Sequence, residues 1–273
     1  MTKSPQEKHA AFADLHRSGC FMIPNPWDVG SAIALQSLGF SALATTSAGM
    51  AWAQGRADTK AGLGRVLDHL TAVCAAVDIP VNADFENGFA DDPEGVRDHV
   101  AQAMATGISG LSIEDSTGKS EAPLYDFELA VARIAAARVA IDANGGGVIL
   151  TGRSEGFIAG RPELDETIRR LRAYSGAGAD CLYAPGLRTE ADISAVVAAV
   201  APKPVNVLTS GLSVATLAAL GVRRISVGGG LARAAWGGFL RAAREIADHG
   251  TFDALAQGAR GGELNALFSS ASE

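Results

Sequence analysis

The sequence predicts an α/β fold, a (β/α)8 TIM barrel with additional C-terminal helices. Short β-branched or apolar runs that end in a polar residue or Gly alternate with helical patterns roughly 12 to 18 residues long. Eight such units fit within the 273 residues. Strands that alternate with helices pair in parallel, and eight units in about 250 residues are typical of a closed barrel rather than an open sheet.

The eight predicted strands are short and follow one another at regular intervals. They cover residues 21–25, 42–47, 80–86, 110–115, 148–153, 180–185, 204–208 and 224–228. Helical segments rich in Ala and Leu lie between them, for example residues 93–106, 127–144, 162–177 and 214–220. Several of these segments begin at Pro or Asp and end at Gly, as helix termini prefer.

We expect one domain over residues 1–273, because no linker or low-complexity segment divides the chain. A last helical stretch, Thr251 to Phe268, follows the eighth unit. We expect it either to close the bottom of the barrel or to pack on another subunit.

The composition indicates a packed protein and excludes two classes of partner. The chain is 48% hydrophobic and 19% charged, which is too apolar for a disordered protein. A net charge of −7 without a basic face argues against a nucleic-acid partner. No run reaches 18 apolar residues, and residues 1–17 lack an apolar core, so we expect no membrane association. Three cysteines without a CxxC pair favour a cytoplasmic location.

Polar side chains close most of the predicted strands, where barrels of this class place their active sites. These residues are Asn25, Thr45, Thr46, Ser47, Asp84, Glu86, Glu114, Asp115, Arg153 and Asn206. None of the five histidines closes a strand, so we expect no His base and no His-rich metal site. We interpret the histidines as lying on solvated helix faces.

Three of the strand-end acids, Asp84, Glu86 and Glu114, are candidate metal ligands. Asp84 and Glu86 are two residues apart, which places both side chains on one face of a strand, and Glu114 closes the neighbouring strand. Ligands that are all oxygen atoms favour Mg²⁺, with Mn²⁺ as the alternative. The other interpretation is that these acids cap helices or pair with surface bases.

Arg153 and Asn206 are candidate substrate ligands. The planar guanidinium of Arg153 suits bidentate binding of a carboxylate or phosphonate, although it could instead neutralise the acids. Asn206 could donate to a substrate carboxylate or be satisfied within the core. The run Gly228–Gly230 follows the eighth strand, where barrels often bind phosphate, or it forms a simple tight turn.

Six segments strongly resemble the isocitrate lyase and phosphoenolpyruvate mutase superfamily, and they follow its order from about residue 20 to 245. They are Pro24–Asp28, Thr45–Gly49, Gly55–Asp58, Asn82–Gly88, Ser112–Asp115 and Thr151–Gly156. The resemblance implies a barrel that assembles as a homotetramer, often with its last helices, here about residues 250–270, exchanged between subunits. It also implies Mg²⁺-dependent chemistry on small 2-oxo or 2-hydroxy acids.

By position, the resemblance assigns roles to ten residues. Those that bind the metal, directly or through water, are Asp84, Glu86 and Glu114. Those that bind the substrate are Thr46, Ser47, Ala48, Arg153 and Asn206. Those with a direct part in the reaction are Asp58 beside the metal, Arg153 on the substrate, and Lys119 in the loop after the fourth strand.

Three features depart from the superfamily pattern. Members that cleave isocitrate or methylisocitrate carry a Cys- and His-containing loop after the fourth strand, whereas residues 116–123 contain neither. Members often place His or Glu at the sixth strand, where this chain has Tyr183 and a substrate-facing role is left empty. Glu86 also replaces the more usual Asp. Cleavage of isocitrate or methylisocitrate is therefore not expected.

The resemblance leaves three functions open. The first is a Mg²⁺-dependent lyase that cleaves a C–C bond of a small 2-oxo or 2-hydroxy (di)carboxylic acid through an enolpyruvate-like intermediate. The second is a C–P bond enzyme of the phosphonopyruvate hydrolase, phosphoenolpyruvate mutase or carboxyphosphonoenolpyruvate mutase type, favoured by the missing Cys and by Lys119. The third is a non-catalytic barrel that binds carboxylates.

Overall fold

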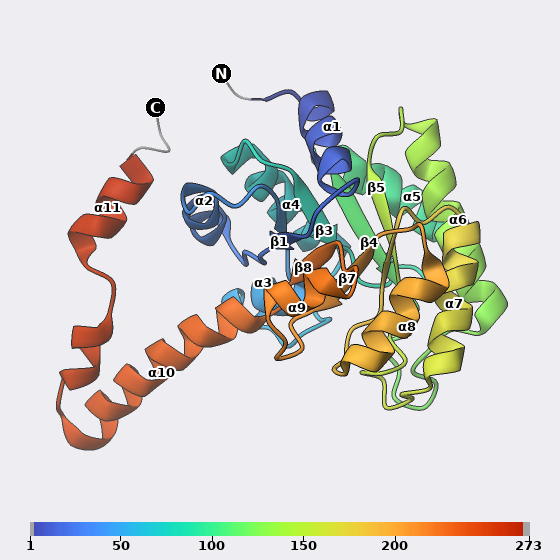
Figure 1. The fold of residues 1–273 in the computed structure, drawn as a ribbon. Coiled ribbons are helices and arrows are strands. Elements are labelled where there is room, and N and C mark those ends of the chain that lie inside the picture. Colours follow the sequence, from blue (N-terminus) through green and yellow to red (C-terminus); the bar gives the residue numbers. More distant parts are fainter. Residues whose placement is uncertain (1–2, 270–273) are drawn as a thin grey trace.

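Eight parallel strands form a nearly closed barrel in the computed structural model, which describes residues 3–269 (Figure 1). The strands are β1 (Phe21–Ile23), β2 (Leu43–Ala44), β3 (Val81–Asp84), β4 (Gly110–Glu114), β5 (Ile149–Arg153), β6 (Cys181–Tyr183), β7 (Val205–Leu208) and β8 (Arg224–Ser226). Each one lies within a predicted strand, and helices alternate with them. The predicted (β/α)8 TIM barrel is confirmed.

The barrel closes at a seam between β1 and β2, the two ends of the paired order β1-β8-β7-β6-β5-β4-β3-β2. The Ala44 N–H donates to the Pro24 carbonyl at 3.1 Å. The buried side chain of Asn25 donates to the Thr45 carbonyl at 3.0 Å and accepts from the N–H groups of Val227 and Gly228, each at 2.9 Å. Asn25 therefore ties the ends of three strands together, which explains why a polar side chain closes β1.

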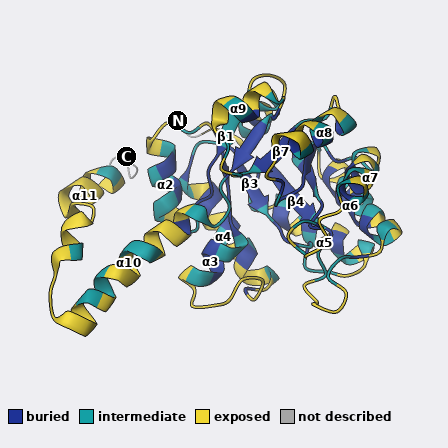
Figure 2. Cartoon of the chain, turned by 60° about the horizontal axis from the view of Figure 1, so that its bottom comes forward, coloured by how far each residue is buried: buried dark blue, intermediate teal, exposed yellow. Residues whose placement is uncertain are grey.

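Helices cover the outside of the barrel, and their inward faces complete a core of aliphatic side chains (Figure 2). The helices of the described chain are α1 (Pro5–Leu15), α2 (Val29–Ser37), α3 (Ser47–Ala53), α4 (Leu63–Ala76), α5 (Pro93–Met104), α6 (Phe127–Ala143), α7 (Leu164–Gly176), α8 (Glu190–Val200), α9 (Val214–Ala219), α10 (Gly230–His249), a 3-10 turn (Asp253–Gln257) and α11 (Gly261–Ser269). Several helices begin with a side-chain cap. At the start of α5, for instance, Asp92 directly precedes Pro93, and its carboxylate accepts a hydrogen bond from the Gly95 N–H.

The amino-terminal end of the barrel is covered by α1, a helix that the strand pattern did not predict. Its buried Phe12 packs so closely on β4 that a Cβ at Gly110 would lie 2.6 Å from the phenyl ring. His16, just after the helix, packs edge-on against Phe12 and Phe21. The interpretation of His16 as a solvated residue is therefore wrong. Burial and the nearby positive charge of Arg224 lower its pKa to about 3.

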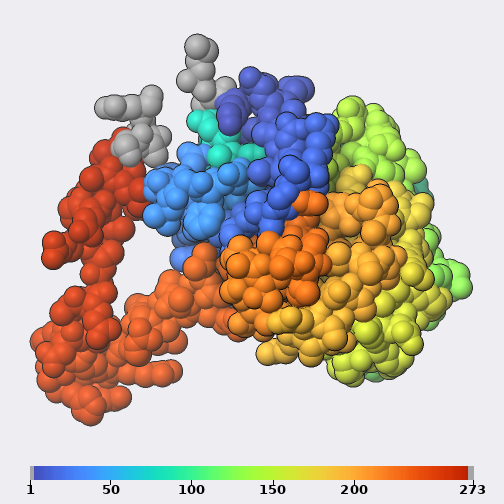
Figure 3. All heavy atoms as spheres, viewed as in Figure 1, coloured from blue at the N-terminus to red at the C-terminus, as the bar shows by residue number. Residues whose placement is uncertain are grey.

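In the C-terminal arm, residues 230–269, α10 extends away from the barrel and the chain then turns back so that α11 contacts α2 (Figures 1 and 3). The predicted helical stretch Thr251–Phe268 consists of two pieces, because extended backbone at Gly258 separates the 3-10 turn from α11. The arm does not close the bottom of the barrel, where α1 lies. Many large apolar side chains are exposed along it: Leu231, Trp236, Phe239, Leu240, Ile246, Phe252, Leu255, Leu264 and Phe268. Within residues 3–269, no helix is both long and apolar enough to span a membrane.

Candidate active site

A cavity of about 180 Å³ lies at the carboxyl ends of the strands and reaches into the barrel. It is far smaller than the roughly 300–1,000 Å³ of pockets for drug-sized ligands, so its size suits a small acid. Seven of the ten predicted site residues line it: Thr46, Ser47, Ala48, Asp58, Asp84, Arg153 and Asn206. The barrel therefore brings together residues that are up to 160 positions apart in the sequence.

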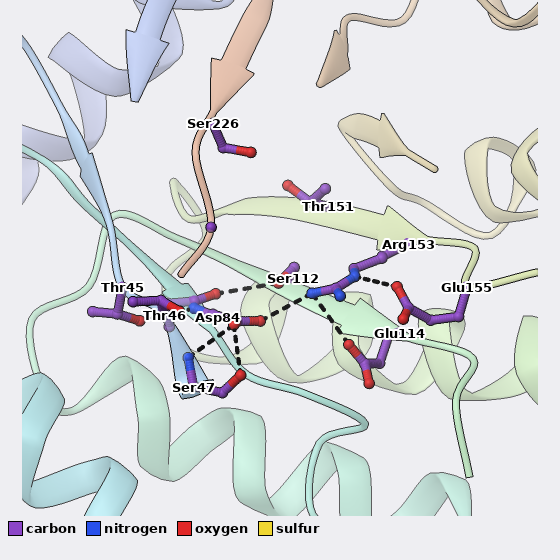
Figure 4. Close-up of polar contacts among 12 residues, drawn as sticks. Thr45, Thr46, Ser47, Asp84, Ser112, Glu114, Thr151, Arg153, Glu155 and Ser226 are labelled. Atoms are coloured by element: carbon purple, nitrogen blue, oxygen red, sulfur yellow. Dashed lines mark hydrogen bonds and ion pairs between the residues drawn. The ribbon is translucent and has the colours of Figure 1, made fainter. Parts of the chain in front are cut away.

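The guanidinium of Arg153, at the end of β5, is the centre of the polar contacts in this cavity (Figure 4). Its Nη1 lies 3.2 Å from Asp84 Oδ1 and 3.2 Å from Glu114 Oε2, and its Nε donates to Glu155 Oε1. Burial alone would lower the pKa of Arg153, but the negative charges of Glu155 and Glu114 outweigh burial and hold the pKa well above its usual value. Arg153 is therefore a permanent cation among three carboxylates.

Asp84, at the end of β3, is held from two sides. The Ser47 N–H and hydroxyl donate to Asp84 Oδ2 at 3.0 and 2.9 Å, while Oδ1 faces Arg153. Ser47 is placed by the start of α3, where the Thr46 hydroxyl accepts from Gly49 N–H at 3.3 Å. Each oxygen of an ionised carboxylate has about two lone-pair sites, so Asp84 Oδ1 retains one for a further partner.

The acids around Arg153 repel one another. Burial first, and then the negative charges of Asp84 and Asp58, raise the pKa of Glu86 to about 7. Burial is also the main cause of the raised pKa values of Glu114 and Asp58. One oxygen of Glu86 is buried without a hydrogen-bond partner among the described residues. A second positive charge at this place would relieve the repulsion.

Lys119 lies outside the cavity. Its ammonium group pairs with Asp91 Oδ2 at 3.3 Å, and more than half of its side chain is exposed. The loop that carries it is folded back on itself, since the Thr117 N–H donates to the Pro123 carbonyl at 3.0 Å. The described conformation therefore does not bring Lys119 to the other predicted site residues.

Asn206 lines the cavity, but both ends of its amide are already used. Its nitrogen donates to Ser226 Oγ at 3.0 Å, and its oxygen accepts from Arg224 Nε at 2.9 Å. The structure therefore favours the interpretation in which Asn206 is satisfied within the barrel and positions its neighbours.

The model of the phosphoenolpyruvate phosphomutase family matches residues 12–247, which include all eight strands and the cavity that they form. The chain belongs to the phosphoenolpyruvate phosphomutase family. The predicted resemblance to the isocitrate lyase and phosphoenolpyruvate mutase superfamily is thus confirmed. This superfamily contains Mg²⁺-dependent C–C lyases together with C–P mutases and hydrolases.

Three similar proteins illustrate the range of this phosphomutase family. A Burkholderia cenocepacia protein with a provisional lyase or mutase assignment is 47% identical, with a TM-score of 0.95 over 97% of this chain and 98% of that one. An oxaloacetate decarboxylase from Bradyrhizobium diazoefficiens is 30% identical over half of this chain and 48% of its own length. A phosphonopyruvate hydrolase, solved with oxalate and Mg²⁺, is 25% identical, with a TM-score of 0.84 over 99% of this chain and 96% of that one.

The acids of this phosphomutase-family site fit Mg²⁺ that keeps much of its hydration shell. Mg²⁺ in proteins is usually bound by one or two carboxylates and several waters. Within residues 3–269, no three acid, His or Cys side chains converge as a ready-made set of direct ligands. The free site on Asp84 and the unpartnered oxygen of Glu86 suit a hydrated cation.

Glu86 differs from its predicted geometry. Strand β3 ends at Asp84, and Glu86 adopts φ +46°, so the alternation of side chains along a strand no longer fixes its direction. Glu86 is not part of the cavity wall, although it lies close enough to Asp84 and Asp58 for their charges to raise its pKa.

Three cavity or near-cavity residues were missed at the sequence level. Tyr183 occupies the position on β6 that was expected to leave a role empty, and its ring centroid lies 5.2 Å from the Arg153 guanidinium carbon. Glu155 holds the Nε of Arg153 and follows it by two positions. Arg224 lines the deeper part of the cavity. A charged residue at the start of an otherwise apolar strand was the signal available for Arg224.

Proposed function

We propose that this protein is a Mg²⁺-dependent lyase that cleaves a C–C bond of a small 2-oxo or 2-hydroxy dicarboxylic acid through an enolpyruvate-like intermediate. The observation that carries the proposal is the position of Arg153 at the end of β5, where it lines the small cavity together with Asp84 of β3 and also contacts Glu114 of the adjacent β4. The similarity to an oxaloacetate decarboxylase supports an oxaloacetate-like substrate.

The chain's own residues supply binding and orientation. Thr46, Ser47 and Ala48 form the wall nearest Asp84, and the Ser47 N–H and hydroxyl are donors that a substrate carboxylate can share. Arg153 orients the substrate by its planar fork, with Tyr183 packed beneath it. Asp84, with Glu86 and Glu114 directly or through water, would hold the metal ion, and Asp58 lies beside them.

The chemistry follows from where the electrons go. When an oxaloacetate-like acid loses its distal carboxylate as CO₂, the bonding pair moves onto the adjacent carbon and the 2-oxo oxygen as an enolate. Bound Mg²⁺ would supply electrostatic stabilisation of that negative charge. The enolate then takes up a proton at carbon, from water or from the loop Ser116–Ser120. The product is pyruvate.

Calorimetric titration of oxalate, a planar mimic of the pyruvate enolate, tests the site. We expect binding only with Mg²⁺ present, and we expect Asp84→Ala to abolish it. A coupled pyruvate assay then compares pyruvate release from oxaloacetate-like acids with release from phosphonopyruvate. The rate measured with the Asp84→Ala protein and Mg²⁺ gives the background reaction caused by the metal alone, and it is subtracted. Oxalate binding without turnover of any acid would instead support a non-catalytic carboxylate-binding barrel.

The C–P bond reaction is the second candidate. It is supported by residues 116–123, which contain neither Cys nor His, and by the similarity to phosphonopyruvate hydrolase. Release of pyruvate and phosphate from phosphonopyruvate, but not of pyruvate from oxaloacetate, would replace the lyase proposal by a hydrolase. Interconversion of phosphonopyruvate and phosphoenolpyruvate would indicate a mutase.

We also propose that the protein forms a homo-oligomer, a tetramer by resemblance, in which the C-terminal arm packs on a neighbouring subunit. The arm leaves the barrel and exposes large apolar side chains, including Trp236, Phe239 and Phe252. Contiguous exposed apolar surface of this kind is typical of an interface. Light scattering coupled to gel filtration measures the mass directly.

A further inference from the structure

Arg224 is a buried cation deep in the same cavity. It is the first residue of β8, so it lies towards the amino-terminal end of the barrel, whereas Arg153 closes β5 at the opposite end. Only 3% of Arg224 is exposed, and it lines the cavity together with Asn82, Asn206 and Ser226. Strand pairing connects the two arginines through one row of residues, Arg153–Tyr183–Asn206–Arg224.

The side-chain partners of Arg224 are all neutral. Its Nε donates to Asn206 Oδ1 at 2.9 Å, its Nη2 donates to Thr151 Oγ1 at 3.0 Å, and its Nη1 lies 3.5 Å from Asn82 Oδ1. The Nη1 also lies 3.3 Å from His16 Nε2.

His16 is a neutral acceptor for Arg224. Its Nδ1 lies 2.7 Å from the Phe12 carbonyl, which can only accept, so the proton is on Nδ1 and Nε2 is free to accept. A pKa of about 3, caused first by burial and then by Arg224, keeps the ring uncharged near neutral pH.

Among the described residues, Arg224 therefore has hydrogen bonds but no carboxylate partner. Of the two other buried arginines within residues 3–269, Arg170 pairs with Asp115 and Glu166, whereas Arg133, outside the cavity wall, donates to the backbone carbonyls of Asn87, Ala90 and Asp91. Burying a charge without a counter-charge is costly, and proteins usually avoid it by pairing. The Nη2 atom of Arg224 carries two N–H groups, and within the described chain it has one partner, Thr151 Oγ1. The deep end of the cavity is thus positively charged and has donor capacity to spare.

We propose that Arg224, together with Ser226, forms an anion subsite for the second negatively charged group of the substrate. This inference rests on the proposed function and deepens it: the substrate carries one acid group at the Asp84–Arg153 end and another anionic group that reaches towards Arg224. A 2-oxo or 2-hydroxy acid with a carboxylate at the end of a short chain has this form. A phosphonate in the same place shares the chemistry.

The test compares acids of equal length that differ in the distal group. Each enantiomer of malate is titrated into the protein with Mg²⁺ present, and its Kd is compared with that of 2-hydroxybutyrate, in which a methyl group replaces the distal carboxylate. A charge-assisted hydrogen bond in a buried site is worth about tenfold or more in affinity, so wild-type protein should bind one malate at least that much more tightly. Phosphonolactate, titrated in parallel, shows whether the subsite prefers a phosphonate to a carboxylate.

Arg224→Met should remove this preference while it leaves the Kd of oxalate, which occupies only the metal end, within about threefold. Arg224→Lys keeps the charge and should retain part of the preference. Arg223→Met is the matched control, because Arg223 precedes Arg224 in the chain, is not part of the cavity wall and donates to the Gly19 carbonyl. Circular dichroism and thermal unfolding verify that each variant is folded.

The outcomes separate the two proposals. If oxalate binds but wild-type protein does not distinguish malate from 2-hydroxybutyrate, the subsite is wrong and the proposed function stands. Persistence of the preference in folded Arg224→Met also overturns the subsite. If oxalate does not bind with Mg²⁺, the proposed function fails and the subsite fails with it. The wild-type comparison needs no variant, so absence of the preference overturns the subsite even if Arg224→Met does not fold, and Arg224→Lys then provides the folded variant.

Discussion

The buried carboxylate of Asp115 accepts a 2.7 Å hydrogen bond from the backbone N–H of Glu155. Its other oxygen accepts from the Tyr174 hydroxyl at 2.6 Å and from Arg170 Nη1 at 3.2 Å. Asp115 therefore joins the end of β4 to the segment after β5 and to α7. Because Glu155 in turn holds Arg153, the position of the Arg153 guanidinium depends on a carboxylate behind the cavity.

Asp115→Asn should destabilise the protein by about 3 kcal/mol, because it removes the buried one of the two carboxylates that pair with the Arg170 guanidinium. Urea unfolding measures this change. The control is Asp142→Asn, which removes a pair with Arg138 in which Asp142 is 66% exposed, and which should cost less than about 1 kcal/mol. Equal losses in the two variants would contradict the role assigned to Asp115.

Arg153→Lys should weaken oxalate binding in the presence of Mg²⁺ by about tenfold or more, because lysine keeps the charge but loses the planar fork. Lysine has a single terminal nitrogen, so it cannot keep all three contacts that Arg153 makes, to Asp84, Glu114 and Glu155. Calorimetry gives the Kd, and Arg138→Lys on the outside of the barrel is the control. An unchanged Kd for Arg153→Lys would mean that Arg153 only neutralises the acids.

The metal-free protein should lose stability as the pH rises from about 4.5 to about 7. Burial and then the neighbouring acids raise the pKa of Glu86 from its ordinary 4.5 to about 7. In this window the folded protein holds a proton that the unfolded chain has released, so the free energy of unfolding decreases with pH.

Thermal unfolding in a chelator across this pH range measures the effect. Glu86→Gln should reduce the slope between pH 4.5 and 7, since glutamine does not titrate, and Glu114 and Asp58, whose pKa values are also raised, account for the remaining slope. Added Mg²⁺ should also reduce the decrease, because a cation stabilises the ionised form. A slope that is the same in Glu86→Gln would exclude Glu86 as its source.

Lys119→Ala should leave stability within about 0.5 kcal/mol of wild type, because its pair with Asp91 is exposed on both sides. If the loop takes part in the reaction, kcat should decrease while the Kd of oxalate is unchanged. Lys8→Ala, on α1 at the opposite end of the barrel, is the control for loss of a lysine charge. An unchanged kcat for Lys119→Ala would remove Lys119 from the reaction.

Phe239→Ser should reduce the mass of the particle in solution, because Phe239 is 60% exposed on the C-terminal arm. Leu38→Ser provides a matched control, since Leu38 is 74% exposed but lies just after α2 and outside the arm. Light scattering should show a smaller species for Phe239→Ser only. A monomeric wild-type protein would refute the oligomer proposal itself.

The sequence by itself determined the barrel and most of its rim. Strand and helix periodicities depend on residues close together in the chain, so the eight strands could be placed to within a few residues. Because the carboxyl ends of parallel strands meet at one end of a barrel, five of the seven cavity residues could be assigned to one site from their strand-end positions, whereas Ala48 and Asp58 were assigned from the family resemblance alone.

Only the tertiary structure decided what each of these side chains contacts. The direction of Glu86 depends on where β3 stops, and the burial of His16 depends on α1 reaching the amino-terminal end of the barrel. The charge of Arg224 became informative only when its partners, which come from β3, β5, β7 and the end of α1, were all found to be neutral. Such contacts join residues up to 208 positions apart, and no local pattern in a sequence records them.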